Sequence, residues 1–265
     1  MALETLFPVP LYKESFKGHQ KFKDLIVPIL TEEYEKAKGS NVKVGWNSDL
    51  FSTFFDQDVH NFGKLRTITK DLVAEFLPSV TNAIKEMGLN PATFSMGNVA
   101  TGNHWYNVYG PGQNQEKHSH IPSSLSLVYS IQYNENIHSP LVFYNPLKWG
   151  EARKFSMFAE EEQTKVYVSQ LYQDKYLPFY DEGDILIFPS ELEHAVFPQE
   201  PESKDYLRMT YSMNIELFSK AECDFIRERE REMMQNRDAR LEKSQFSTSH
   251  YTPSSVKPKG QSYFT

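Results

Sequence analysis

After residue 90 the sequence consists of short runs rich in Val, Ile, Tyr and Phe, separated by Gly, Pro and Asn. Runs of this length and composition predict β-strands. Because no helical segments alternate with them, they favour an antiparallel sandwich or jelly-roll barrel over a fold of alternating strands and helices. We expect a mainly β fold with strands at residues 93–99, 104–109, 125–133, 140–144, 152–158, 166–171, 184–188, 195–197 and 206–217.

Two helical patterns precede this region. Apolar residues at helical spacing run from about residue 20 to 38, and again from residue 65 until just before Gly88. Each pattern contains one proline, Pro28 or Pro78, which should bend or divide its helix. An edge strand or extended lead-in at residues 6–12 comes first, since prolines interrupt that apolar run.

The last part of the chain differs again. Ser219-Lys220-Ala221-Glu222 has the pattern of a capping box and predicts the start of a helix, whose alternating charges indicate a solvated face. From about residue 244, a tail rich in Ser, Thr, Pro and Lys should be flexible. The predicted α+β chain thus has three parts: a helical buttress packed on the core in residues 1–90, a β core in 91–218, and a C-terminal helix with a flexible tail in 219–265.

Composition restricts the environment of the protein. The 265 residues can bury one substantial core, and the net charge of -7 argues against a surface for duplex DNA or an anionic membrane. The single cysteine, Cys223, suits a reducing compartment. No apolar run is long enough to span a membrane, and the first residues lack the pattern of a secretory signal. We therefore expect a cytoplasmic protein.

Three histidines predict a metal site. His118 and His120 stand two residues apart, so on a β-strand both would point to the same face. His194, from a distant strand, would complete a three-point grip that leaves other coordination positions open. This arrangement is typical of a catalytic metal. The other histidines are expected to be ordinary hydrogen-bonded residues: His19, His60, His104, His138 and His250.

Arg208 and Thr210 lie one strand step apart on the last predicted strand. A fixed guanidinium beside a metal is suited to binding a carboxylate. The alternative for Arg208 is a surface ion pair with Asp205 or Glu216.

Further motifs surround these residues, and over about residues 6–217 the chain resembles the Fe(II)- and 2-oxoglutarate-dependent dioxygenases. It is most similar to a branch common in bacteria and their phages. Asn107-x-Tyr109 is also similar to a motif of alkylation-repair dioxygenases. The motifs that carry the resemblance are Trp105-Tyr106-Asn107, His118-Ser119-His120, Pro122-Ser123-Ser124-Leu125-Ser126-Leu127-Val128-Tyr129, Phe143-Tyr144-Asn145-Pro146, Gly183-Asp184-Ile185-Leu186-Ile187-Phe188-Pro189-Ser190, His194, and Arg208 with Thr210.

The resemblance implies a double-stranded β-helix, an iron(II) cofactor, and 2-oxoglutarate and O₂ as co-substrates. Its usual ligands are His-x-Asp or His-x-Glu with a distal histidine, so His120 stands where the family has a carboxylate. Either His120 binds iron, which the strand spacing favours, or it stands off and water, Glu116 or Glu193 fills the position.

The resemblance also implies roles around 2-oxoglutarate. Arg208 would bind its distal carboxylate with help from Thr210, while Asn107 and Tyr109 would contact the same molecule from the opposing sheet. The reaction would convert 2-oxoglutarate to succinate and hydroxylate an unidentified substrate. Trp105 is expected to belong to the core.

Two alternatives use the same features differently. Three histidines also hold zinc in hydratases and hydrolases, where the metal activates water and Arg208 has no role. The β-helix could instead be a non-catalytic binding or assembly module, because a fold alone does not guarantee activity. The acidic balance does not encourage nucleic acid as a partner, and the oligomeric state is not encoded in any pattern.

Overall fold

The computed structural model of the chain describes residues 9–37, 48–54, 63–89, 99–146 and 174–248. The strands predicted at 152–158 and 166–171, and nearly all of that at 93–99, lie outside these residues, as does the tail from residue 249 onward. Two compact units make up the chain, Met1–Leu217 and Phe218–Thr265.

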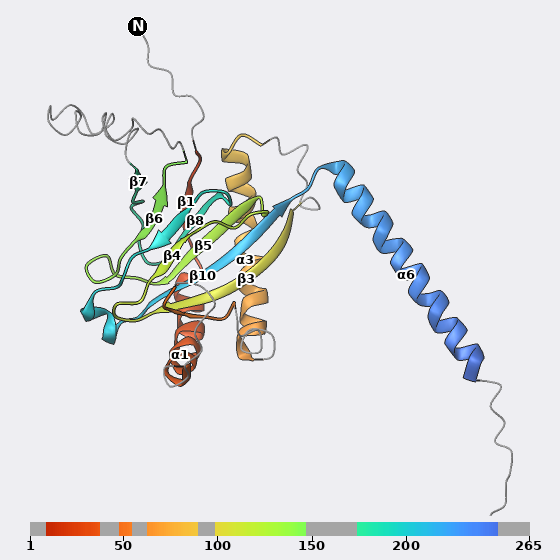
Figure 1. The fold of residues 1–265 in the computed structure, drawn as a ribbon, viewed down its shortest axis with the longest axis horizontal. Helices are drawn as coiled ribbons and strands as arrows, with labels where there is room; N and C mark the ends of the chain where they lie inside the picture. Colours follow the sequence, from red (N-terminus) through yellow and green to blue (C-terminus); the bar gives the residue numbers. More distant parts are fainter. Residues whose placement is uncertain (1–8, 38–47, 55–62, 90–98, 147–173, 249–265) are drawn as a thin grey trace, which may run out of the picture. The chain divides into compact units, whose positions relative to one another are not determined.

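Two antiparallel sheets form the centre of the first unit (Figure 1). The large sheet has the order β1 (Tyr12–Ser15), β8 (Asp184–Pro189), β5 (Leu125–Gln132), β10 (Arg208–Leu217), β3 (Val99–Tyr109) and β2 (Phe51–Ser52). The small sheet has the order β4 (Gln115–His118), β9 (His194–Val196), β6 (Leu141–Tyr144) and β7 (Lys175–Tyr176). The predicted double-stranded β-helix with flanking helices is confirmed.

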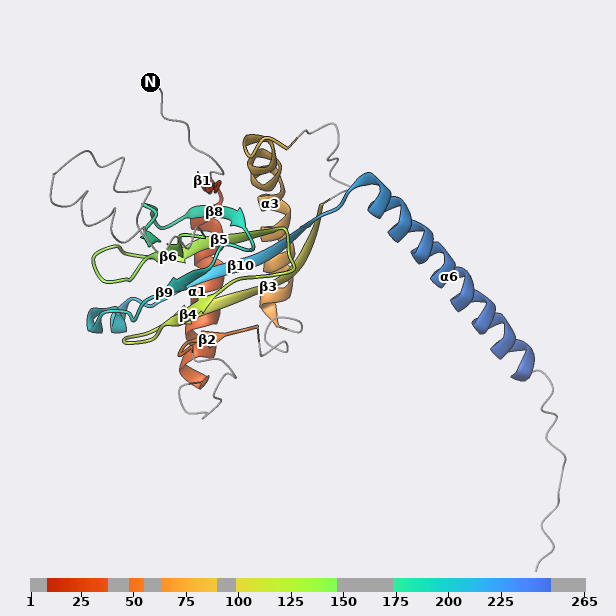
Figure 2. The same ribbon diagram turned by 45° about the horizontal axis from the view of Figure 1, so that its top comes forward.

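Helices cover one face of the large sheet (Figure 2). They are α1 (His19–Ala37) and α3 (Lys64–Glu86), which pack against each other, and α1 also contacts β5. Pro28 and Pro78 lie inside these helices, so neither proline divides its helix. A short 3-10 helix, η2 (Pro201–Asp205), precedes β10.

Strand β8 is apolar on both faces because both are buried. Ile185 and Ile187 join the apolar core beneath the helices. Leu186 and Phe188 point the other way and join a second apolar cluster with Phe143 of the small sheet. The large sheet therefore has helices on one side and the small sheet on the other.

Strand β10 alternates strictly between polar and apolar residues. Its apolar side chains enter the core beneath the helices; they are Met209, Tyr211, Met213 and Ile215. The opposite face carries what we call the polar row of β10: Arg208, Thr210, Ser212, Asn214 and Glu216. A row of polar groups on an inner face requires partners, and it marks where the site lies.

The N-terminal part contributes strands as well as helices. Strand β1 pairs with β8 at one edge of the large sheet, with Tyr12 opposite Ile187. Residues 6–8 of the strand predicted at 6–12 lie outside the described residues, and of residues 9–12 only Tyr12 belongs to β1, because Pro10 has no N–H to offer a neighbouring strand.

The second unit begins with the predicted helix, α6 (Lys220–Thr248). Its capping box is confirmed: the Ser219 N–H donates to Glu222 Oε2 at 2.7 Å, and the Glu222 N–H donates to Ser219 Oγ at 3.2 Å. The helix continues past residue 244, where the flexible tail was predicted to begin. Among the described helices, none is both long and apolar enough to cross a bilayer.

Candidate functional site

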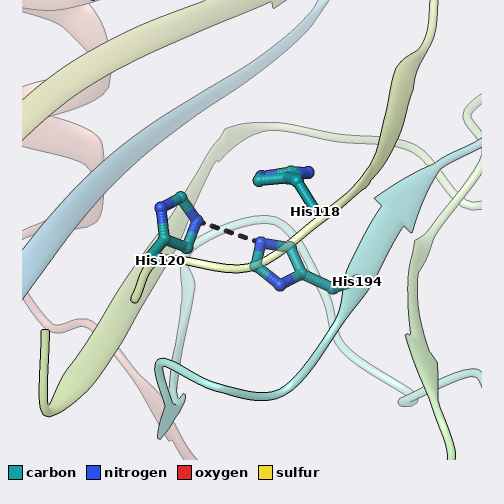
Figure 3. A group of neighbouring side chains, drawn as sticks. All are labelled: His118, His120 and His194. Carbon is teal, nitrogen blue, oxygen red and sulfur yellow. Dashed lines mark hydrogen bonds between the residues drawn. The ribbon is translucent and has the colours of Figure 1, made fainter. Parts of the chain in front are cut away.

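Three imidazoles converge between the two sheets (Figure 3). His118 ends β4 and His194 begins β9, and the two are direct partners in the small sheet. One ring nitrogen from each of His118, His120 and His194 lies within 4.8 Å of the other two. The predicted grouping of these three side chains is therefore present, and its size suits a single metal ion.

His120 reaches the group from a loop. Strand β4 ends at His118, so the prediction that strand alternation aims His118 and His120 together is wrong. The chain turns toward Pro122, and the His120 N–H donates to the Ser190 carbonyl at 2.9 Å. This bond ties the loop to the end of β8, and the His120 ring lies 5.0 Å from that of His194.

Backbone carbonyls determine the tautomers of two rings. His118 Nδ1 lies 2.7 Å from the Glu116 carbonyl, and His194 Nδ1 lies 2.9 Å from the Leu192 carbonyl. A carbonyl only accepts hydrogen bonds, so each Nδ1 carries the proton and each Nε2 keeps its lone pair. His120 Nε2 lies 3.1 Å from His194 Nε2, and in this tautomer it is the donor. The Nε2 atoms of His118 and His194 thus carry lone pairs, whereas His120 carries its lone pair on Nδ1 and would bind a metal through Nε2 only after its proton moves to Nδ1.

Burial keeps these imidazoles neutral. It lowers the pKa of His118, and it lowers that of His120 to about 4 with a contribution from nearby His118. Burial lowers the pKa of His194 well below its usual value, and the other two rings add to this effect. Neutral imidazole is the form that binds a metal, so the three rings are ready to act as ligands near neutral pH.

No carboxylate joins the imidazoles within the described part of the chain. Glu193 points to Lys117, whose Nζ lies 2.9 Å from Glu193 Oε2. Glu116 lies on the same strand as His118, yet its carboxylate is not among the grouped ligand atoms.

Arg208 is buried, with 1% of its surface exposed, which excludes the surface ion pair. Its guanidinium lies 4.8 Å from the centre of the Tyr109 ring, and Nη2 donates to the Tyr180 hydroxyl at 3.2 Å. Nε and Nη1 are buried without a hydrogen-bond partner among the described residues. Leaving charged donors buried and unpaired is costly, so these two nitrogens are suited to an anionic ligand.

Asn107 and Tyr109 lie beside Arg208 rather than opposite it. Strand β3 neighbours β10 in the large sheet, with Tyr109 paired to Arg208 and Asn107 paired to Thr210. The prediction of contact from the opposing sheet is therefore wrong, because the last strand inserts next to β3. Asn107 Oδ1 is also buried without a partner, and burial raises the pKa of Tyr109 to about 12, so its hydroxyl stays protonated.

Two further residues belong to this group but were not predicted. Tyr180 accepts hydrogen bonds from Arg208 Nη2 and from the Leu141 N–H, the latter at 2.9 Å. Gln115 Oε1 accepts a bond of 2.7 Å from the Tyr109 hydroxyl. Neither lies in a motif, although Gln115 stands at the start of the strand that leads to His118.

The imidazoles and the guanidinium line one small cavity, together with Asn107, Tyr109 and Thr210. A larger cavity of about 570 Å³ is also lined by His118 and His120. Trp105 was predicted to belong to the core. Its side chain is buried, but it also lines both cavities.

The outlying histidines that the structure describes include two well-bonded ones. His19 Nδ1 lies 2.8 Å from the Tyr129 hydroxyl, and His138 Nε2 lies 2.6 Å from the Tyr206 carbonyl. His60 and His250 lie outside the described residues.

Comparison with known proteins identifies a family that the β core resembles. Residues 103–214 match the model of a family described as "Putative 2OG-Fe(II) oxygenase". Over these residues, the chain is similar to that family of oxygenases. The resemblance predicted from the motifs is thereby confirmed, and with it iron(II) as cofactor and 2-oxoglutarate as co-substrate of the family. No curated protein matches the sequence.

Solved structures resemble this chain only distantly. A Pseudomonas putida prolyl-4-hydroxylase is 10% identical, with a TM-score of 0.47 over 79% of this chain and 93% of its own. AviO1 from Streptomyces viridochromogenes is 8% identical, with a TM-score of 0.49 over 78% of this chain and 90% of its own. A viral collagen prolyl hydroxylase from Paramecium Bursaria Chlorella virus-1, in complex with 2OG, is 12% identical. Its TM-score is 0.42 over 79% of this chain and 96% of its own. We draw no conclusion from likenesses this weak.

The residues of the site fit both groups that the family uses. Three neutral imidazoles with converging nitrogens suit a divalent transition metal. The unpaired nitrogens of Arg208 suit a carboxylate, which accepts two parallel hydrogen bonds from one guanidinium. Asn107 also lines this cavity, and its Oδ1 is buried without a partner among the described residues. The amide of this side chain can donate hydrogen bonds as well as accept them.

Proposed function

We propose that this protein is an Fe(II)- and 2-oxoglutarate-dependent dioxygenase that hydroxylates its primary substrate. His118, His120 and His194 would hold the iron, with His120 in the position where relatives have a carboxylate. Arg208 would bind the distal carboxylate of 2-oxoglutarate, and Thr210, Asn107 and Tyr109 would line the same pocket.

One observation carries the proposal. The buried guanidinium of Arg208, with two unpaired nitrogens, lines the same small cavity as the three imidazoles. A protein does not bury an uncompensated charge without cost, and a bound dicarboxylate would offset that cost. The metal and the acid are therefore expected in one cavity.

The protein's own share of the reaction is to position and to shield. When bound, iron(II) with 2-oxoglutarate and O₂ supplies the oxidising chemistry, and 2-oxoglutarate leaves as succinate and CO₂. The two-pronged guanidinium of Arg208 fixes the orientation of the acid, and Tyr180 holds that guanidinium in place. Apolar side chains of Val128, Leu141 and Val196 complete the wall and exclude water.

The alternatives explain less of the site. A zinc hydratase needs the three imidazoles but gives no reason for a buried, unpaired Arg208. A non-catalytic module gives no reason for three buried neutral imidazoles that share a centre. Only the oxygenase uses both groups.

The direct test is spectroscopic. Under anaerobic conditions, adding iron(II) and 2-oxoglutarate together should produce the weak visible absorption of a chelated keto acid, and neither addition alone should do so. In air, the same mixture should release succinate slowly even without a primary substrate. Tightly held zinc with no response to 2-oxoglutarate would instead support the hydratase, and failure of every divalent metal to raise the melting temperature would support the non-catalytic module.

A further inference from the structure

The larger cavity, of about 570 Å³, is a second compartment of the site. His118, His120 and Trp105 line both it and the small cavity, so the two cavities adjoin at these side chains. A cavity of this size accommodates a small molecule or a single side chain of a larger one. On the proposed function, it is where the primary substrate would lie.

Its walls are negatively charged. Glu116 of β4 and Glu216, the last member of the polar row of β10, both line it. Among the described lining residues there is no lysine or arginine. Neither carboxylate has an ion-pair partner within the described part of the chain. Two carboxylates without cations in one concave space favour a cationic ligand.

Trp105 provides an independent sign that a ligand belongs here. Its side chain is 3% exposed, and its indole N–H is buried with no hydrogen-bond partner among the described residues. Asn214 of the polar row also lines the cavity and has a buried Oδ1 without a partner. A ligand with both an acceptor and a donor would satisfy these two groups.

Aromatic rings complete the recognition surface. Phe54 meets Trp105 edge to face, with ring centres 5.3 Å apart and an interplanar angle of 80°. Both rings line the cavity beside the carboxylates. The faces of such rings attract organic cations.

From this arrangement we propose that the primary substrate is an organic cation, carrying an amine or guanidinium that Glu116 and Glu216 bind, with an acceptor group that meets the Trp105 indole. This inference rests on the proposed function for the identity of the reaction, and it assigns the class of molecule that the reaction takes. A hydrogen-bonded carbonyl and a terminal ammonium, as in a lysine residue, meet these requirements.

The test compares three probes that differ in charge: Nα-acetyl-lysine methylamide, its norleucine counterpart and its glutamate counterpart. Calorimetry at low salt measures their binding to the full chain, metal-free and anaerobically loaded with iron(II) and 2-oxoglutarate. We expect the lysine probe to bind at least about tenfold more tightly than the other two, and less tightly as salt is added.

Glu216→Gln and Glu116→Gln should each weaken binding of the lysine probe by about fivefold while leaving that of the norleucine probe unchanged. The matched control is Glu75→Gln, which removes the same charge from an exposed position on α3 and should have no effect. Melting temperatures of the variants identify any that fail to fold. Removing either carboxylate without effect on the lysine probe, or equal or tighter binding of the norleucine or glutamate probe, would overturn the substrate assignment.

The two proposals fail separately. If the keto acid absorption forms but cations are not preferred, the oxygenase stands and the substrate assignment is wrong. If cations are preferred but no such absorption forms, the cavity binds cations and the proposed reaction is wrong.

Discussion

The two ends of the buried site are held by the fold in different ways. At the guanidinium end, Arg208 and Thr210 lie on β10, a long strand with β5 and β3 on either side. At the imidazole end, His118 and His194 stand at the tips of short strands, and His120 lies in a loop. A rigid sheet fixes the anchor for the co-substrate, whereas the ligand set can change at residue 120 without altering any strand pairing.

The ends also differ in what they require energetically. The imidazoles are neutral, so burying them without a metal leaves no charge uncompensated. Arg208 is always charged, and its burial remains costly until an anion arrives. Substitutions at the two ends should therefore separate binding of the acid from binding of the metal.

The largest effect is expected at the guanidinium end. Arg208→Met should weaken 2-oxoglutarate binding by about 100- to 1000-fold, the cost of removing one partner of a buried charge pair, and leave metal affinity nearly unchanged. Calorimetry with each ligand measures both. In the absence of 2-oxoglutarate, the variant should melt no lower than the parent, because it lacks the unpaired charge.

Arg208→Lys is the matched control. It keeps the charge but loses the two-pronged geometry, so its affinity for 2-oxoglutarate should fall between those of the parent and the methionine variant. Normal 2-oxoglutarate binding by Arg208→Met would remove the distinction between the two ends.

The second effect is at the imidazole end. Four ligands together supply ~10–16 kcal/mol of binding free energy in structural zinc sites. Loss of one ligand in His120→Ala should therefore weaken metal binding by roughly 100-fold or more. His120→Asp, which restores the carboxylate of the family, should recover most of this affinity. If His120→Ala bound the metal as tightly as the parent and Glu116→Gln bound it more weakly, Glu116 would be the third ligand instead of His120.

A smaller effect tests how the guanidinium is held. Tyr180→Phe removes the hydroxyl that accepts from Arg208 Nη2, and it should weaken 2-oxoglutarate binding about tenfold. Tyr176→Phe, at an exposed position on β7, is the control and should bind normally. Equal affinities in the two variants would mean that Tyr180 does not position Arg208.

The smallest effect concerns pH. His138 accepts the Asn134 N–H at Nδ1 and donates from Nε2 to the Tyr206 carbonyl, and burial lowers its pKa to about 4. Since the unfolded chain binds this proton at a higher pH, the free energy of unfolding falls as pH drops from about 6.5 toward 4. The contribution of His138 should be about 1 kcal/mol between pH 7 and 5.5. Denaturant titration of metal-free protein should show a shallower pH dependence in His138→Gln, and an identical slope would refute this role.

The features predicted correctly depend on periodicity or on residue type. Arg208 and Thr210 share a face because any strand places alternate residues together, whatever its neighbours. The same alternation extends to Ser212, Asn214 and Glu216, so the polar row could have been recognised from the sequence of β10. The capping box was correct because its bonds are local.

The features that were missed depend on contacts between distant segments. The position of β3 beside β10 is set by pairing across about a hundred residues, which no local pattern encodes. Tyr180 reaches Arg208 from a different loop, and His120 lies beyond the end of its strand. The sequence therefore predicted which residues lie together in the site more reliably than it predicted which strands or loops carry those residues.

The central claim is that one metal on three imidazoles and one acid on Arg208 share a cavity. A crystal structure of the protein grown anaerobically with iron(II) and 2-oxoglutarate tests it most directly. We expect iron bound by the Nε2 atoms of His118, His120 and His194, and a carboxylate of 2-oxoglutarate on Nε and Nη1 of Arg208. Iron held by only two of these imidazoles, or 2-oxoglutarate bound away from the guanidinium, would contradict it.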